Sequence, residues 1–179
     1  QEVPDAVILA VGSSPVVPPI KGIENAIPAL AVYDDGAVLG ERIVMVGGGL
    51  VGCETGLHLA KSGHKVTVVE MLARAANESY GMYREALLLE MQKAGMRIIT
   101  SAKCTEIARS GVQIEREDAT QEWFEADAVV YALGMRPSAT DDLQTALGSI
   151  PYVKIGDCAR AAKVDAAIKE GFLAAMDIL

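Results

Sequence analysis

The fold of this chain is decided by the stretch Ile43-Val44-Met45-Val46-Gly47-Gly48-Gly49-Leu50-Val51-Gly52. Its apolar first part, mostly β-branched, predicts a buried strand, and the part that follows matches the pattern GxGxxG. A helix is expected over residues 50–62, ended by Gly63. Because the glycines follow a strand and open a helix, they have the context that dinucleotide binding requires.

The glycines of this turn have distinct expected roles. Gly47 permits the tight turn, Gly49 lets a pyrophosphate approach the backbone, and Gly52 lets the helix pack closely on the strand. The turn is completed by Gly48, Leu50 and Val51. The free amides and the dipole at the helix start would then face two negative phosphates.

Glu70 is the expected partner of the adenine ribose. It ends a predicted strand and lies 23 residues after Gly47, close to the spacing of about 20 typical of the ribose-binding acid. A carboxylate there bonds the free 2′-hydroxyl of NAD and repels the 2′-phosphate of NADP, which favours NAD(H), whereas the nearby Arg74 favours NADP(H). Two alternatives stay open: a structural turn with an incidental glutamate, and a methyltransferase, which also uses an acid after its second strand.

Further elements are expected on both sides of this unit. Apolar runs predict strands. Gly63 and Gly95 predict where the first two helices end, and one-sided apolar stripes predict the helices at 80–94 and 162–179. The expected strands are 6–11, 43–46, 65–70, 96–100, 128–133 and 152–155, and the expected helices are 50–62, 80–94 and 162–179. Residues 103–125 alternate between apolar and polar, which predicts an antiparallel meander, and residues 13–29 predict an extended connection. The fold class is therefore α/β, a Rossmann-like parallel sheet with a small antiparallel meander.

An internal repeat suggests that the chain belongs to a longer protein. Asp5-Ala-Val-Ile-Leu-Ala-Val-Gly-Ser-Ser-Pro15 aligns with Asp127-Ala-Val-Val-Tyr-Ala-Leu-Gly-Met-Arg-Pro137, with six of eleven positions identical. The alternative is two similar strands that each end in a glycine turn. If the unit is duplicated, the first copy's phosphate turn lies before Gln1, and we expect the chain to be cut inside its first nucleotide-binding unit.

Composition and charge exclude several partners. The 179 residues are 51% hydrophobic, and 24 acidic against 16 basic side chains give a net charge of −8, so nucleic acid and anionic membranes are not expected to bind. No apolar run approaches the length of about 18 residues that a membrane span needs. The cysteines are far apart and form neither a CxxC pair nor a metal set; they are Cys53, Cys104 and Cys158. Structural thiols and a cytoplasmic location are expected.

Some polar side chains are assigned no chemistry. The acids and bases that follow Glu70 are interpreted as a solvated face; they are Glu78, Arg84, Glu85, Glu90 and Lys93. The Gly156-Asp157 pair, taken alone, is a common turn. No catalytic residue and no metal ligand is assigned.

An ordered set of motifs resembles the two-dinucleotide-domain flavoprotein oxidoreductases, the pyridine nucleotide–disulfide reductase superfamily. The set is Ala10 to Pro15, Gly47 to Glu54, Glu70, Ala132 to Gly134 and Gly156-Asp157. In that family an NAD domain is inserted into an FAD domain. The resemblance implies an NAD(H)-binding domain at 39–138 and remnants of a truncated FAD domain at 1–38 and 139–179.

Closer motifs resemble one branch of this superfamily, the NADH:flavin oxidoreductases of the 2,4-dienoyl-CoA reductase, 2-enoate reductase and trimethylamine dehydrogenase group. They are residues 83–89, 157–160 and 163–171. This likeness implies an N-terminal barrel with FMN and an iron–sulfur cluster, and an upstream FAD segment, as partners in the same polypeptide. It also implies hydride transfer from NADH to FAD, and onward to an enoate or 2,4-dienoyl-CoA type substrate.

The resemblance also implies roles for single residues. Glu54 would lie toward the meeting point of nicotinamide and flavin, with an exposed acid at a helix start as the alternative. Gly134 would lie under the nicotinamide. Gly12, Gly156 and Asp157 would face FAD, with Asp157 toward the ribityl chain.

Other functions stay open. The chain could be a fragment of a disulfide or ferredoxin reductase, whose redox cysteines would lie upstream, or a non-catalytic NAD-binding module. The chain alone is expected to hold no FAD, because the phosphate turn and ribose acid of that site would precede Gln1. Strand 6–11 and helix 162–179 are then expected to expose apolar surface that favours a homodimer.

Overall fold

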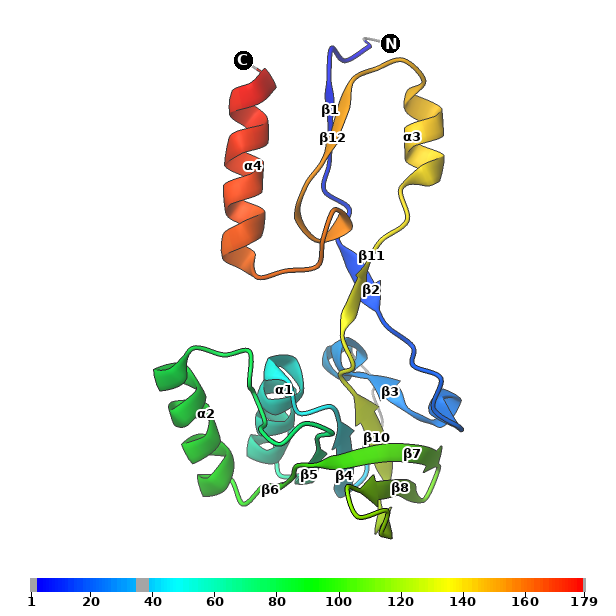
Figure 1. Ribbon diagram of the computed structural model, residues 1–179, viewed down its shortest axis with the longest axis vertical. Coiled ribbons are helices and arrows are strands. Elements are labelled where there is room, and N and C mark those ends of the chain that lie inside the picture. Colours follow the sequence, from blue (N-terminus) through cyan, green and yellow to red (C-terminus); the bar gives the residue numbers. More distant parts are fainter. Residues whose placement is uncertain (1–2, 35–38, 179) are drawn as a thin grey trace. The chain divides into compact units, whose positions relative to one another are not determined.

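The computed structural model describes residues 3–34 and 39–178. The chain divides into two compact units, one formed by Gln1–Val16 with Gly134–Leu179 and the other by Val17–Leu133 (Figure 1). We call them the split unit and the central unit. Each is described in turn.

A parallel sheet forms the middle of the central unit. Its strands lie in the order β3 (Ile27–Pro28), β10 (Ala128–Tyr131), β4 (Arg42–Val46), β5 (Lys65–Val69) and β6 (Arg97–Ile99), and every neighbouring pair is parallel. Helices α1 (Leu50–Lys61) and α2 (Gly81–Lys93) follow β4 and β5. The predicted α/β class with a Rossmann-like sheet is confirmed.

Both faces of this sheet are covered, which explains why its strands are almost continuously apolar. Ile43 and Met45 of β4 point to the side of α1 and α2, where they pack with Cys53 and Met91. The alternate residues Val44 and Val46 point to the opposite side. There they join the buried side chains of the antiparallel strands, which are Cys104, Ile107, Val112 and Ile114.

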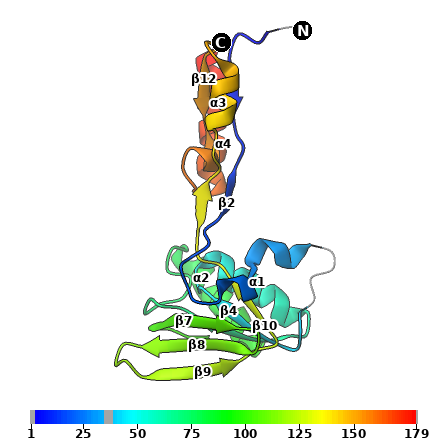
Figure 2. The ribbon, with the colours of Figure 1, turned by 90° about the vertical axis from the view of Figure 1, so that its right-hand side faces the viewer.

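The predicted meander is the second layer of the central unit. Strands β7 (Ala102–Ala108), β8 (Gly111–Arg116) and β9 (Gln121–Glu125) form an antiparallel three-stranded sheet, seen side by side in Figure 2. The register between β7 and β8 shifts once, between Cys104 and Glu106. The sheet supplies the apolar cover that the parallel strands need on this side.

The split unit has little regular sheet. Strand β1 (Val7–Leu9) pairs in parallel with β12 (Tyr152–Lys154), and β2 (Ser13–Pro15) pairs antiparallel with β11 (Met135–Pro137). Helices α3 (Asp141–Leu147) and α4 (Val164–Ile178) complete it, and Figure 1 shows them beside the β1–β12 pair. The described chain also contains the short 3-10 turns η1 (Ile23–Asn25), η2 (Ala29–Tyr33) and η3 (Gly156–Cys158).

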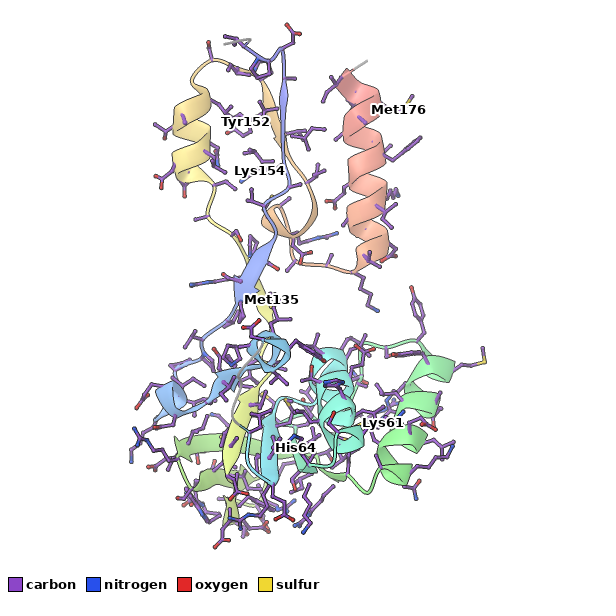
Figure 3. All side chains as sticks on the ribbon, turned by 180° about the vertical axis from the view of Figure 1, so that it is seen from behind. Lys61, His64, Met135, Tyr152, Lys154 and Met176 are labelled. Carbon is purple, nitrogen blue, oxygen red and sulfur yellow. The ribbon has the colours of Figure 1, made fainter. Side chains whose placement is uncertain are left out.

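The split unit exposes the apolar surface that the sequence leads us to expect. Val164, Ile168 and Phe172 on α4 are 74%, 68% and 67% exposed, and Ala174 is the one residue of this helix that is buried. Figure 3 labels Met176 on the same helix, which is also exposed. In strand β1, Ile8 is exposed as well. Within the described residues, β1 pairs with one strand, β12, whereas β10, β4 and β5 of the central unit each pair with two.

Three features differ from the expected elements. Residues 13–29 are more than an extended connection, because they contain β2, η1 and β3. Helix α3 and the β2–β11 pairing were not expected. Leu179, the last residue of the expected apolar stripe, lies outside the described residues.

Candidate dinucleotide-binding site

The turn between β4 and α1 can be built only with glycine at two positions. Gly47 has φ of +99°, and a Cβ there would lie 2.4 Å from the carbonyl oxygen of Ala132. A Cβ on Gly52, in the first turn of α1, would lie 1.9 Å from the carbonyl oxygen of Gly47. The helix therefore packs against the turn more closely than any residue with a Cβ atom would allow.

Gly49 differs from these two glycines. Its backbone is extended, with φ −64° and ψ −176°, which any residue adopts. A Cβ on Gly49 would meet only the flexible end of the Glu78 side chain, at 2.9 Å from Oε1. The fold thus tolerates a larger residue at Gly49, and the missing side chain leaves the backbone at the start of α1 open to a bound group.

Glu70 lies directly beside this turn, at the end of β5. Its carboxylate is 7% exposed; Oε2 accepts from the backbone N–H of Gly48 and Oε1 from that of Leu72, both at 2.7 Å. These two bonds satisfy a buried charge and fix its position. Each carboxylate oxygen has a further lone pair, so the group can still accept a hydroxyl hydrogen.

Arg74 follows in the segment between β5 and α2. Its side chain is exposed. In the same segment Ala75 and Ala76 are buried, and the carbonyl oxygen of Ala75 accepts from Arg84 Nε at 2.8 Å. Arg84 is thereby tied to the backbone, so it is more than a member of a solvated face.

Glu54 on α1 makes a contact that the sequence did not reveal. Its carboxylate accepts a hydrogen bond of 2.5 Å from the hydroxyl of Tyr83 on α2. This bond raises the pKa of Tyr83, because losing the proton would place two negative oxygens side by side. The partner could not be found from spacing, since 29 residues separate the two side chains.

Glu78 corrects an expectation. It was placed on a solvated face, but its carboxylate accepts a hydrogen bond from the backbone N–H of Leu50, the first residue of α1. The interaction crosses from the segment between β5 and α2 to the phosphate turn. Nothing in the local sequence indicates it, because the two residues are 28 positions apart.

The cysteines of the central unit are structural. Cys53 and Cys104 are buried, and loss of hydration raises the pKa of each thiol to about 11. At neutral pH both are therefore thiols, which are poor nucleophiles. Cys53 Sγ donates to the carbonyl oxygen of Gly48 at 3.3 Å, so it packs behind the turn.

A second cluster lies within the split unit. Gly12 and Gly156 both have positive φ, of 73° and 61°. Ser13 Oγ donates to Asp157 Oδ2 at 2.8 Å, and the backbone N–H of Gly156 donates to Glu170 Oε2 at 2.6 Å. Gly12, Gly156 and Asp157 border a hollow of about 410 Å³ that Lys163 and Ala167 also line. The structure thus brings Gly12, Gly156 and Asp157 together.

Gly134 belongs to the split unit rather than to the unit that holds the glycine turn. It is exposed with φ of +99°, and its carbonyl oxygen accepts from Val16 N–H at 3.0 Å. Its neighbours Ala132 and Leu133 are the residues that contact Gly47.

Comparison with known proteins places this arrangement in a family. The model of the pyridine nucleotide-disulphide oxidoreductases matches residues 3–171. The chain belongs to this family. Its members share a domain built to bind dinucleotides, and that description agrees with the glycine turn and the buried Glu70.

Several members of the pyridine nucleotide-disulphide oxidoreductase family are similar over nearly the whole chain. Bilirubin reductase of Mediterraneibacter gnavus is 36% identical over 97% of the chain, and NADH oxidase of Thermoanaerobacter brockii is 36% identical over 98%. The solved structure of 2-naphthoyl-CoA reductase is 31% identical over 95% of the chain, with a TM-score of 0.86. The chain spans 28% of each of these two curated relatives and 26% of the solved one.

Within residues 3–34 and 39–178, no three His, Cys, Asp or Glu side chains are grouped as metal ligands. Among the described helices, none is both long and apolar enough to cross a membrane.

Proposed function

We propose that the chain binds NAD(H) at the glycine turn and delivers its nicotinamide to FAD in a longer flavoprotein oxidoreductase. The observation that carries this proposal is the buried Glu70 carboxylate, fixed on the Gly48 amide beside a turn that excludes side chains. Gly47 and Gly52 shape the turn, and the backbone amides of Gly49, Leu50 and Val51 would receive the pyrophosphate, that of Leu50 in place of its bond to Glu78. The nicotinamide supplies the hydride, and the protein holds and orients the dinucleotide.

NADH is the expected cofactor rather than NADPH. The Glu70 carboxylate, held at the end of β5 by two backbone donors, can accept from a ribose hydroxyl. A 2′-phosphate at the same place would be repelled by this charge. Arg74 is exposed and could instead turn toward a phosphate, so the two cofactors must be compared directly.

The split unit is proposed to carry part of an FAD site. Asp157 faces the ribityl chain, and Gly12 and Gly156 keep the backbone close to the flavin, next to the hollow that they border. Gly134 would lie under the nicotinamide, and Glu54 would lie toward the meeting point of nicotinamide and flavin. We assign residues 39–138 to the NAD domain, and 1–38 and 139–179 to the FAD domain.

The proposed parent enzyme passes electrons onward to an enoate or 2,4-dienoyl-CoA type substrate. Cinnamate reductase of Clostridium sporogenes is 46% identical over 67 residues, or 37% of the chain, and 2-naphthoyl-CoA reductase supports the same class. FMN and an iron–sulfur cluster would belong to the rest of that protein. Nitric oxide reductase FlRd-NAD(+) reductase of Klebsiella pneumoniae, 29% identical over 76% of the chain, favours a second candidate, an NADH-dependent reductase of a redox protein.

Calorimetric titration with NADH and NADPH tests the proposal. The unmodified chain should bind NADH more tightly than NADPH. Glu70→Ala should reduce the difference between the two affinities, because alanine neither accepts from the ribose hydroxyl nor repels the 2′-phosphate. Glu117→Ala, which removes an exposed acid from the β8–β9 turn, is the matched control and should leave the difference between the NADH and NADPH affinities unchanged. Tighter binding of NADPH by the unmodified chain would refute the assignment of Glu70.

A further inference from the structure

The Glu78 carboxylate lies at the start of α1, where the proposed site receives a pyrophosphate. The backbone N–H of Leu50 donates to Glu78 Oε1. The same oxygen is 2.9 Å from the place that a Cβ on Gly49 would take. The carboxylate therefore contacts both residues that open the helix, on the side left bare by the missing side chain.

The backbone that carries Glu78 is held firmly. Ala76 N–H donates to the carbonyl oxygen of Gly48 at 2.7 Å, and Arg84 Nε donates to that of Ala75 at 2.8 Å. Ala76 is fully buried and has φ of +48°, a left-handed conformation that few residues adopt. The segment thus presents Glu78 to the turn from a fixed position.

The Glu78 side chain is exposed, in contrast to its backbone supports. It is therefore able to rotate into solvent while Ala75 and Ala76 stay in place. Because the side chain is exposed and its backbone is fixed, a ligand can displace the carboxylate without refolding of the segment.

A carboxylate and a phosphate compete for the same features of a helix start. Both are anions that accept hydrogen bonds from its first amides and are stabilised by its dipole. Two like charges at one helix start also repel each other. The bound dinucleotide and the observed position of Glu78 therefore exclude each other.

We propose that Glu78 is an internal competitor that occupies the phosphate position of the ligand-free protein and must leave before NAD(H) binds. This inference rests on the proposed function. The side chain stabilises the empty turn and lowers the affinity for the cofactor, so NADH that is released is replaced at once by a group of the same chain.

The test compares NADH affinities of the unmodified chain, Glu78→Gln, Glu78→Ala and the control Glu117→Gln. Glu78→Gln removes the charge but keeps an acceptor, and we expect it to bind NADH about tenfold more tightly, or about 1.4 kcal/mol. Glu78→Ala should also bind more tightly, with a lower melting temperature because α1 loses its cap. Glu117→Gln, which changes the net charge equally, should stay within about twofold.

The outcomes separate the two proposals. NADH binding that is unchanged or weaker in both Glu78 variants would overturn the competitor role, leave the proposed function intact, and show that Glu78 only caps α1. Failure of all four proteins to bind NADH would overturn the proposed function and the competitor role with it. Tighter binding in both Glu78 variants, with the control unchanged, would support both.

Discussion

Apolar runs of the same kind are buried in the central unit and exposed in the split unit. In the central unit, β4 alternates between two buried clusters, so Met45 is fully buried and Val44 is 2% exposed. In the split unit, β1 leaves Ile8 at the surface, and α4 leaves Phe172 67% exposed. An apolar run thus predicts a strand or helix, but whether that element is buried depends on what lies against it.

The glycine clusters of the two units also differ in how closely other atoms surround them. A Cβ added to Gly47 or Gly52 would lie within 2.4 Å of a backbone oxygen, whereas a Cβ added to Gly12 would have no described atom within 4 Å. The central unit combines a closed turn, a helix start and a buried acid. The split unit combines Asp157 and two glycines with the start of α4, at Lys163 and Val164, around one hollow, but its sequence has no GxGxxG turn.

The largest expected effect is a difference in ligand binding between the units. The chain should bind NADH but retain no FAD through gel filtration, because residues 47–52 are its one GxGxxG sequence. We expect the affinity for FAD to be at least a hundredfold lower, or about 2.8 kcal/mol. The measurement is the absorbance of the eluted protein in the flavin bands. One bound FAD per chain would contradict the expected difference in ligand binding between the two units.

The second effect concerns stability. Met45→Ala should lower the free energy of unfolding by about 2–5 kcal/mol, because it opens a cavity between the sheet and α1. Phe172→Ala removes an even larger side chain but should cost less than about 0.5 kcal/mol, since the ring is 67% exposed. Urea unfolding, followed by circular dichroism, measures the free energy of unfolding of both variants. Equal losses of this free energy in Met45→Ala and Phe172→Ala would show that α4 is buried in solution.

A smaller effect is expected at the second cluster. Ser13→Ala removes the hydrogen bond to Asp157 and should cost about 1 kcal/mol of stability. Binding of NADH should not change, because the glycine turn lies in the other unit. The same unfolding curves and titration provide the measurement; weaker NADH binding would mean that the hydrogen bond between Ser13 and Asp157 contributes to the NAD(H) site.

The sequence predicts the central unit well because its signals are local. Residues 43–46 are an apolar run buried on both sides, and residues 65–69 contain three buried valines. Gly63 and Gly95 close the expected helices with positive φ. Helix α3 was missed because it is short and buries no residue, so it has no apolar stripe to find. Strands β2 and β11 have three residues each and include prolines, which argue against strands.

The candidate site is predictable only in part for a similar reason. Glu70 could be found because its distance from the glycines along the sequence is nearly constant in this kind of site. The contacts of Glu78 with Leu50 and of Tyr83 with Glu54 join segments 28 and 29 residues apart through side chains. Such pairs depend on how the segment between β5 and α2 folds back on the turn, and no local pattern encodes it.

The most direct test of the central claim is NADH binding to Gly49→Val. A Cβ here would meet the flexible end of Glu78, which can move aside, so the fold should survive, whereas the bulk of the valine should block the pyrophosphate. We predict a cooperative thermal melt with a melting temperature no lower than that of Glu78→Ala, because the valine displaces the same cap, together with at least tenfold weaker NADH binding in calorimetric titration. Unchanged NADH affinity in a folded Gly49→Val protein would show that the cofactor does not bind at this turn.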